Sequence, residues 1–193
     1  MSKTYVGVSD VARQVNGIYV GVNNVARKVL WAYAGDENNV ARKVYQSGNE
    51  VSIPTMTSNT APSGTASASS IQSNDYPAWK AFDKNENTFW ASLLYGSDHN
   101  RWVQYDFGYL VLPLSIKVKN YSSNNNAWSF VIEASTAGSS WDTLVDCSSN
   151  TAQVNTTYQI STSTMYRYYR YRCTNGANTY RAGVYEFNVT GIS

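Results

Sequence analysis

The sequence predicts an all-β protein: an antiparallel β-sandwich preceded by a region of short β-hairpins. Three observations support this fold class. Short runs in which apolar and polar residues alternate recur from about residue 71, and turn-rich stretches separate them. The first 47 residues contain a repeat of β-prone residues. No long stretch has the 3.6-residue period of an amphipathic helix, and the best helical candidate, residues 77–82, is a turn or two at most.

The repeat predicts one hairpin per copy. Its copies span residues 5–15, 19–29 and 33–44 and start 14 residues apart, and the third carries one extra residue. Ser9-Asp10 and Asn23-Asn24 separate two β-prone runs, and Asn and Asp tolerate the left-handed conformations of tight turns. A lone hairpin cannot bury its apolar face. We therefore expect assembly with a partner or a homo-oligomer, with a trimer favoured; the alternative is a small appendage packed on the main domain.

The later runs predict the strands of the sandwich. Ile116 and Val118 share one face of a strand, and Lys117 and Lys119 share the other. We place the domain boundary after residue 47, which gives a hairpin region for assembly or attachment (1–47) and a binding domain (48–193). By composition alone, 48–70 is a linker rich in Ser, Thr, Gly and Pro. The predicted strands are 102–107, 114–119, 129–134, 166–172 and 184–189.

Composition excludes several classes of partner. The chain has 193 residues, with 15 Lys and Arg against 13 Asp and Glu, so its net charge is +2. This balance gives no basic stripe for a nucleic acid or an anionic membrane surface. No run reaches transmembrane length, so we expect no membrane insertion, and no secretion signal is visible at the N-terminus. The 16 Tyr and 6 Trp suit sheet faces, sugar platforms and protein interfaces.

Catalytic and zinc chemistry find little support. The sequence has no nucleophile elbow, phosphate loop or His-rich metal cluster, so we do not expect an enzyme. Two cysteines, Cys147 and Cys173, allow at most one internal disulfide. Spacing leaves open whether they pair, and reduced thiols are favoured.

Several motifs in order resemble the discoidin, or coagulation-factor type C, family. They lie at residues 76–83, continued by Thr88 and Trp90, and at 102–108, 130–135, 141–144 and 185–191. Phe107 stands where the family has Leu, Ala137 replaces an Asp, and the family's terminal Cys pair is missing. The resemblance implies a galactose-binding-like jelly roll over 53–193, so the linker-like stretch opens the domain. We expect Trp90, Trp102 and Phe107 to pack in its core.

The resemblance also implies one structural calcium ion. In similar domains an Asp, a Thr and a late Glu bind it, and here those positions are Asp83, Thr88 and Glu186, with Asn85 or Lys80 expected to add a backbone oxygen. Oxygen ligands suit Ca²⁺. The alternative is a loop held by hydrogen bonds of Asx turns, with no metal or with sodium.

A ligand surface is implied on the loops at one end of the sandwich, at family positions within 73–77, 121–128 and 178–182. Sugar recognition needs an aromatic face together with amide or guanidinium groups. The 94–101 segment supplies the other side of the pocket. The alternative is that these are ordinary exposed loop residues. The candidate ligand-binding residues are Tyr76, Asn125, Trp128, Tyr180, Arg181, His99 and Arg101.

The hairpin repeat resembles one found in tail-associated proteins of bacteriophages and prophages. Together, the two resemblances imply a non-catalytic carbohydrate-binding component of a phage tail, baseplate or fibre. It would contact host-cell surface glycans and other virion proteins, and it would reside on the virion after synthesis in the host cytoplasm. One alternative is a structural or decoration protein of the virion, whose sandwich loops contact other proteins. Another is a carbohydrate-binding module separated from a bacterial secreted hydrolase.

Overall fold

A computed structural model describes residues 48–93, 101–121, 129–174 and 181–193, together with the backbone of six strands in the first 47 residues. The chain divides into two compact units, Met1–Asn49 and Glu50–Ser193. This division falls two residues after the boundary that the sequence predicts.

The N-terminal unit contains three hairpins, each a separate two-stranded antiparallel sheet. Their register repeats: Tyr5 lies opposite Gln14, as Tyr19 lies opposite Lys28. In the third hairpin Tyr33 lies opposite Lys43, next to a register shift. The strands are β1 (Tyr5–Val8), β2 (Val11–Gln14), β3 (Tyr19–Val22), β4 (Val25–Lys28), β5 (Trp31–Gly35) and β6 (Ala41–Gln46).

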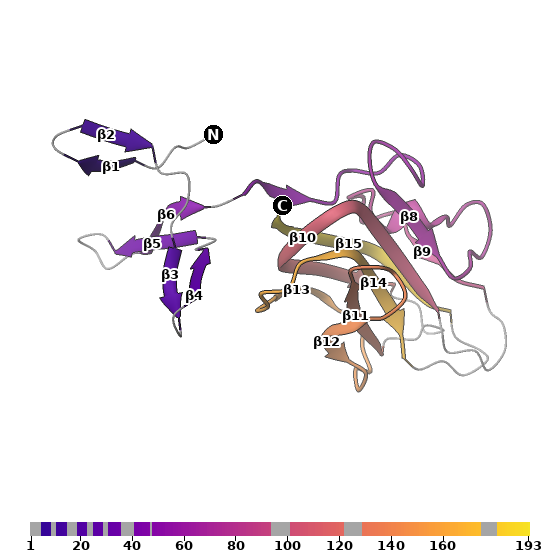
Figure 1. The fold of residues 1–193 in the computed structure, drawn as a ribbon. Coiled ribbons are helices and arrows are strands. Elements are labelled where there is room, and N and C mark those ends of the chain that lie inside the picture. Colours follow the sequence, from indigo (N-terminus) through magenta and orange to yellow (C-terminus); the bar gives the residue numbers. More distant parts are fainter. Residues whose placement is uncertain are drawn as a thin grey trace. The chain divides into compact units, whose positions relative to one another are not determined.

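The second unit is the predicted antiparallel β-sandwich (Figure 1). One layer has the order β12-β11-β14-β10, with β8 on the other side of β10; the second layer joins β7, β15, β10 and β13, and β9 pairs with β15. Its elements are β7 (Glu50–Ser52), β8 (Thr65–Ala68), the 3₁₀ helix η1 (Ala78–Ala81), β9 (Trp90–Ala91), β10 (Trp102–Asn120), β11 (Phe130–Ser135), β12 (Asp142–Cys147), β13 (Asn155–Gln159), β14 (Tyr166–Cys173) and β15 (Gly183–Ile192).

Strand β10 belongs to both layers. Its first half pairs with β14 and β8, and its second half pairs with β15 and β13. The register with β14 breaks between Asp106 and Val111, where Gly108 has φ +79°, a conformation that favours glycine. Figure 1 shows the resulting sharp bend. The sequence predicts two separate strands here, 102–107 and 114–119, whereas the structure has one strand that runs through the bend.

The core lies between the two layers. Val103 and Tyr105 enter it from the first half of β10, and Ile116 and Val118 from the second half. Trp90 and Phe107 are buried as predicted. Trp102 is not in the core. In the first half of β10 the odd-numbered residues face inward, so Trp102 faces outward and is half-buried.

The stretch with a linker-like composition is part of the sandwich. Strand β7 pairs with the end of β15, and β8 pairs with β10. Ile53 and Met56 are each only 1% exposed. Strands β12 and β13 have no counterpart among the predicted strands, since they are short and mostly exposed and lack a clear apolar face.

The two cysteines are not joined in a disulfide. Cys147 on β12 and Cys173 on β14 both lie opposite Phe130 on β11, which separates them. Two strand spacings amount to about 10 Å, and a disulfide needs Cα atoms within about 7 Å. The sheet order therefore keeps the thiols apart.

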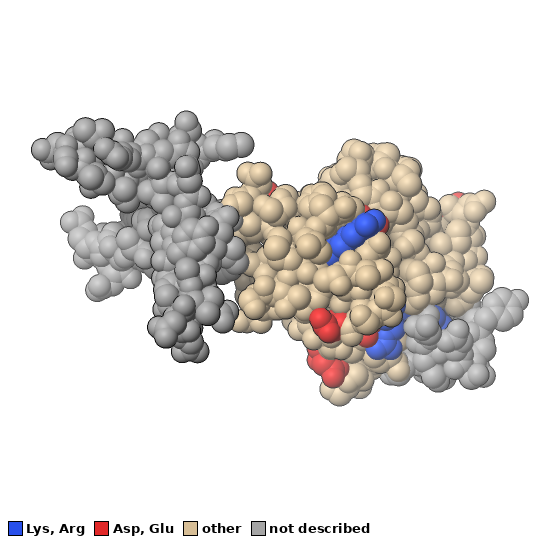
Figure 2. All heavy atoms as spheres, in the orientation of Figure 1, with Lys and Arg blue, Asp and Glu red and all other residues tan. Residues whose placement is uncertain are grey.

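Surface charge is sparse on the face of the sandwich that Figure 2 displays, where small groups of opposite sign lie near one another. This agrees with the 15% charged residues in the sequence. Within the described part of the chain, no helix is long and apolar enough to span a membrane.

Candidate functional site

Residues that flank three stretches of the chain meet at one end of the sandwich. The backbone N–H groups of Ser92 and Tyr121 donate to the carbonyls of Ala182 and Gly183, each at 2.9 Å. At the same distance, the N–H groups of Cys173 and Thr174 donate to Arg101 and Ser129. The described residues that flank 94–100, 122–128 and 175–180 therefore lie at this end, which we call the loop end. The predicted ligand residues His99, Asn125, Trp128 and Tyr180 lie in these stretches, outside the described residues.

Four aromatic rings from four separate segments form a cluster beside the loop end. We call Tyr76, Phe89, Tyr121 and Tyr185 the aromatic stack. The Phe89 ring stacks on Tyr121 with centroids 4.1 Å apart and lies 4.7 Å from Tyr76. Tyr185 closes the group at 5.3 Å from Tyr121 and 5.4 Å from Phe89. All four rings are partly exposed, so the stack offers both ring faces and phenol hydroxyls to a ligand.

A bulge in β15 positions Tyr185. Glu186 pairs with Lys119, whereas Val184 pairs with Asn120, so Tyr185 is the extra residue on its strand. Bulges re-aim side chains and are common beside binding sites. Here the bulge places Tyr185 next to Tyr121, the residue directly after the end of β10.

Of the predicted ligand residues that are described, Tyr76 belongs to the aromatic stack and Arg181 lies near it. Burial raises the pKa of Tyr121, the neighbouring Tyr185 and Tyr76 raise it further, and the Arg181 charge opposes the rise. The Nε of Arg181 is buried and has no hydrogen-bond partner among the described residues. Arg101 is only 5% exposed, so most of its side chain lies inside the domain at this end.

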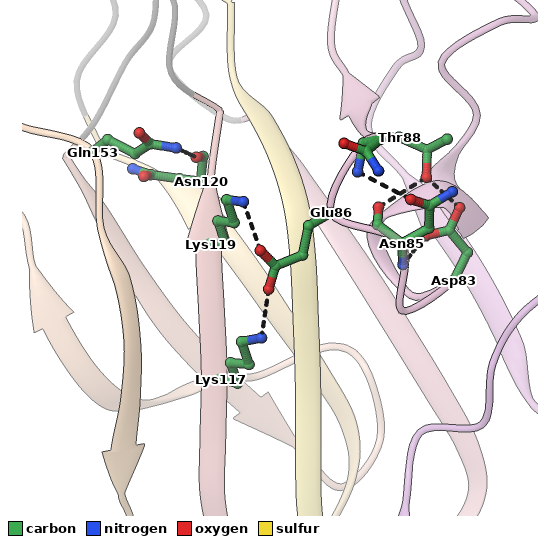
Figure 3. Close-up of polar contacts among 9 residues, drawn as sticks. Asp83, Asn85, Glu86, Thr88, Lys117, Lys119, Asn120 and Gln153 are labelled. Atoms are coloured by element: carbon green, nitrogen blue, oxygen red, sulfur yellow. Dashed lines mark hydrogen bonds and ion pairs between the residues drawn. The ribbon is translucent and has the colours of Figure 1, made fainter.

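An ion-pair cluster adjoins the aromatic stack. The Glu86 carboxylate accepts hydrogen bonds from Lys117 Nζ at 2.8 Å and Lys119 Nζ at 2.7 Å (Figure 3). These two bonds lower the pKa of Glu86 to about 2. The Lys119 ammonium also lies 5.2 Å from the centre of the Tyr185 ring, within cation–π range. Charged and aromatic groups thus form one continuous surface.

The predicted cation loop is a tight turn held by its own side chains (Figure 3). The Asn85 N–H donates to Asp83 Oδ1 at 3.0 Å, and the Thr88 hydroxyl lies within hydrogen-bond distance of Asp83 Oδ2 and of the Asn85 carbonyl. Lys84 adopts the left-handed conformation with φ 56°. Asp83, Asn85 and Thr88 therefore meet in one turn, and the hydrogen bonds among them are those expected of an Asx turn.

Glu186 tests whether this region suits a cation. Its side chain is 4% exposed, and Oε2 has no hydrogen-bond partner among the described residues. Burial raises its pKa to about 7; Asp83 and Glu86 add to the rise, whereas Lys117 and Lys84 oppose it. A buried, unpaired carboxylate oxygen near a second acid is costly, and a bound cation would relieve that cost. The donor set fits Ca²⁺, although no group of three or more His, Cys, Asp or Glu side chains in the described ranges is placed to hold a metal.

Sequence reasoning placed Tyr121 within a predicted ligand loop without naming it as a candidate residue, and it did not identify Phe89 or Tyr185 as part of the site. Tyr121 had a signal, because it continues the outward alternation of Lys117 and Lys119. Tyr185 had none, since its direction depends on a bulge that no local pattern announces.

Comparisons with known proteins agree with this fold. The F5/8 type C domain model matches residues 65–187, and no curated protein sequence matches significantly. The chain is similar to chitosan-binding module 1 of a Paenibacillus sp. IK-5 chitosanase/glucanase (27% identity, 69% of this chain, 98% of that chain, TM-score 0.55). It also resembles the family 32 carbohydrate-binding module of Clostridium perfringens NanJ in complex with galactose (23%, 74%, 99%, 0.57). A third similar structure is a C. perfringens module, CpGH89CBM32-5, in complex with GalNAc-β-1,3-galactose (18%, 65%, 94%, 0.54). Because the family model spans well over half of the sequence, this protein belongs to the F5/8 type C domain family.

Proposed function

We propose that this protein is a non-catalytic glycan-binding protein whose site lies at the loop end, around the aromatic stack and Arg181. The single observation that carries the proposal is the convergence of four partly exposed rings and a guanidinium group from distant segments. Aromatic rings pack against the apolar faces of sugar rings, and guanidinium groups donate hydrogen bonds to hydroxyls. Such groups bind a ligand without providing acid–base chemistry.

The similar structures favour a carbohydrate over other ligands. The Paenibacillus module binds chitosan, and the two C. perfringens modules are in complex with galactose and with a galactose-containing disaccharide. These proteins share this fold over nearly their whole length. The fold itself accommodates many ligands, so the aromatic stack of this chain is the stronger argument.

We also propose a structural Ca²⁺ held by Asp83, Thr88 and Glu186, with a backbone oxygen of Asn85. The support is the unpaired Oε2 of Glu186 near the Asp83 carboxylate. The ion would fix the 83–88 loop, which leads directly into Phe89 of the aromatic stack. A cation at this place would act by positioning the stack rather than by touching the glycan.

The N-terminal hairpins point to a role in assembly. Each forms a two-stranded sheet by itself in the described strands, and an isolated two-stranded sheet is marginally stable. We propose that they join copies of the chain, as a trimer, and attach it to other proteins of a phage tail, baseplate or fibre. The protein would be made in the host cytoplasm, reside on the virion and contact host-cell glycans. Several copies would convert weak single-site binding into avidity.

A glycan array tests the proposed function. Its probes are galactose, GalNAc-β-1,3-galactose, chitosan oligomers and neutral glucans, applied to the wild type and to Tyr121→Ala and Arg181→Ala. Tyr109→Ala is the matched control, because Tyr109 is 49% exposed and lies in the bend of β10, twelve residues before Tyr121. We expect binding that both site variants weaken and the control retains.

Failure to bind any probe would favour the alternative, a structural virion protein whose loops contact other proteins. Light scattering of the full chain then tests assembly. One chain has a mass of 21.4 kDa, and a mass that stays at this value at all concentrations would contradict the oligomer.

A further inference from the structure

A small cavity opens on the outer face of the sandwich, on strands β10 and β15. Its volume is about 230 Å³, and it is lined by Lys84, Glu86, Lys117, Glu186 and Asn188. Pockets that enclose drug-sized ligands measure about 300–1,000 Å³. This cavity therefore suits a smaller group, of the size of one sugar ring.

The lining offers hydrogen-bond acceptors that lack donors. The side-chain oxygen of Asn188 and Oε2 of Glu186 are both buried and have no partner among the described residues. Buried acceptors without partners are uncommon in folded proteins. With Glu186 assigned to the proposed cation, the Asn188 oxygen is the acceptor to which a hydroxyl of a bound molecule can donate.

The lining also provides donors, and its formal charges balance. The ammonium groups of Lys84 and Lys117 accompany the acidic side chains of Glu86 and Glu186. A hydroxyl group is both donor and acceptor, so a polyhydroxyl ligand can accept from the lysine ammonium groups and donate to the Asn188 oxygen. A saccharide unit has this chemistry.

The cavity is joined to the aromatic stack by direct contacts. Glu86 and Lys117 line the cavity, and Glu86 also bonds Lys119, which lies over the Tyr185 ring. The outward residues Lys117 and Lys119 of β10 are followed by Tyr121, directly after the end of the strand. Four residues of a strand span about 14 Å, so the surface is longer than a single pyranose ring.

We propose that the outer face of β10 and β15 binds a glycan chain lengthwise, with one sugar unit on the aromatic stack and another in the cavity of Lys117 and Asn188. The inference rests on the proposed glycan-binding function and adds a second subsite to it. A cation shared by Glu186 and Asp83 leaves Asn188 and the lysines available for the ligand.

The test measures affinity against chain length for the full-length protein. The probes are glucosamine and its β-1,4-linked oligomers of two, three and four units, and galactose beside GalNAc-β-1,3-galactose. For whichever series binds, we expect the affinity of the longer members to exceed that of the monosaccharide about tenfold. We expect Tyr185→Ala to weaken every member about tenfold, as loss of an aromatic contact does. Asn188→Ala and Lys117→Gln should weaken only the longer members, and Tyr109→Ala should weaken none.

Asn188→Ala also separates binding from folding. It removes a buried oxygen that has no partner, so the thermal midpoint should not fall. The proposal would be overturned if a longer oligosaccharide bound no more tightly than its monosaccharide. It would also be overturned if the Asn188→Ala and Lys117→Gln variants bound the longer oligosaccharides with wild-type affinity. Absence of binding to every probe would instead refute the proposed function itself.

Discussion

Gly64 occupies a position where an added methyl group has no room. Its φ is +69°, and a Cβ built there would lie 2.5 Å from Cζ of Tyr105, closer still to the hydroxyl of that ring, and 2.7 Å from the Asp106 carbonyl. Tyr105 is 1% exposed and donates to the Ser63 carbonyl at 2.7 Å. Gly64→Ala must therefore displace a core ring and a strand carbonyl. Three costs add up: left-handed strain of about 1–2 kcal/mol, overpacking of about 1–3 kcal/mol and a lost hydrogen bond of about 1 kcal/mol. We therefore expect Gly64→Ala to lower the free energy of unfolding by about 3–6 kcal/mol.

Gly108 provides the matched control. Its φ is +79°, but an added Cβ would meet nothing within 4 Å. Gly108→Ala should therefore cost only the strain of about 1–2 kcal/mol. Urea unfolding followed by tryptophan fluorescence gives both free energies, provided that the slope m is unchanged. Equal losses for the two variants would refute the argument that the close approach of Tyr105 dominates at Gly64.

Four further outcomes follow from the structure. Glu133 is 5% exposed and accepts hydrogen bonds from Arg170 and Arg172. Glu133→Gln should therefore lower the free energy of unfolding, measured in urea, by about 3 kcal/mol. Glu86→Gln is the control: it breaks exposed ion pairs and should leave the urea midpoint nearly unchanged. Burial alone would raise the pKa of Glu133, but the bonds and charges of Arg172 and Arg170 outweigh it and lower that pKa. The stabilisation by Glu133 should therefore be complete above pH 4.5, the pKa of this group in the unfolded chain, and should fade as the pH falls through the lower pKa of the folded state. A difference in unfolding free energy between wild type and Glu133→Gln that is as large at pH 2 as at pH 7 would contradict this. Calcium should raise the thermal midpoint of the wild type but not of Asp83→Asn, with EDTA reversing the effect; a midpoint indifferent to calcium would remove the cation proposal. Cys147 and Cys173 should titrate as two thiols per chain in urea without reductant, and a value near zero would mean that the sheet order separating them is wrong.

The sequence was sufficient for the fold where each strand has a single buried face. Ile116 and Val118 alternate with Lys117 and Lys119, and the structure buries the first pair and directs the second to Glu86. Trp102 shows the limit of such reasoning. Its size favours the core, but the register of its neighbours decides which face it occupies, and register is a property of the whole sheet.

The site was less predictable than the fold. Tyr76 was identified through its family position and Tyr121 lay in a predicted ligand loop, whereas the structure adds Phe89 and Tyr185 from two other segments. Phe89 and Tyr121 are 32 residues apart in sequence yet stack at 4.1 Å, because β10 returns to the loop end after its bend. Local patterns carry no information about such long-range contacts; these depend on how strands pair.

Asn120 connects the stability of the sandwich to the geometry of the site. It is fully buried at the end of β10, directly before Tyr121. Its side-chain oxygen accepts from the Val154 N–H at 2.7 Å, and its carbonyl accepts from Gln153 Nε2 at 2.8 Å (Figure 3). These bonds fix the last residue of the strand against the segment that precedes β13. The strand therefore cannot slip without breaking buried hydrogen bonds, and the Tyr121 ring stays in the aromatic stack. The same strand carries Lys117 and Lys119, so fixing its end also fixes the two proposed subsites relative to each other. A rigid core therefore preorganises the binding surface for its ligand.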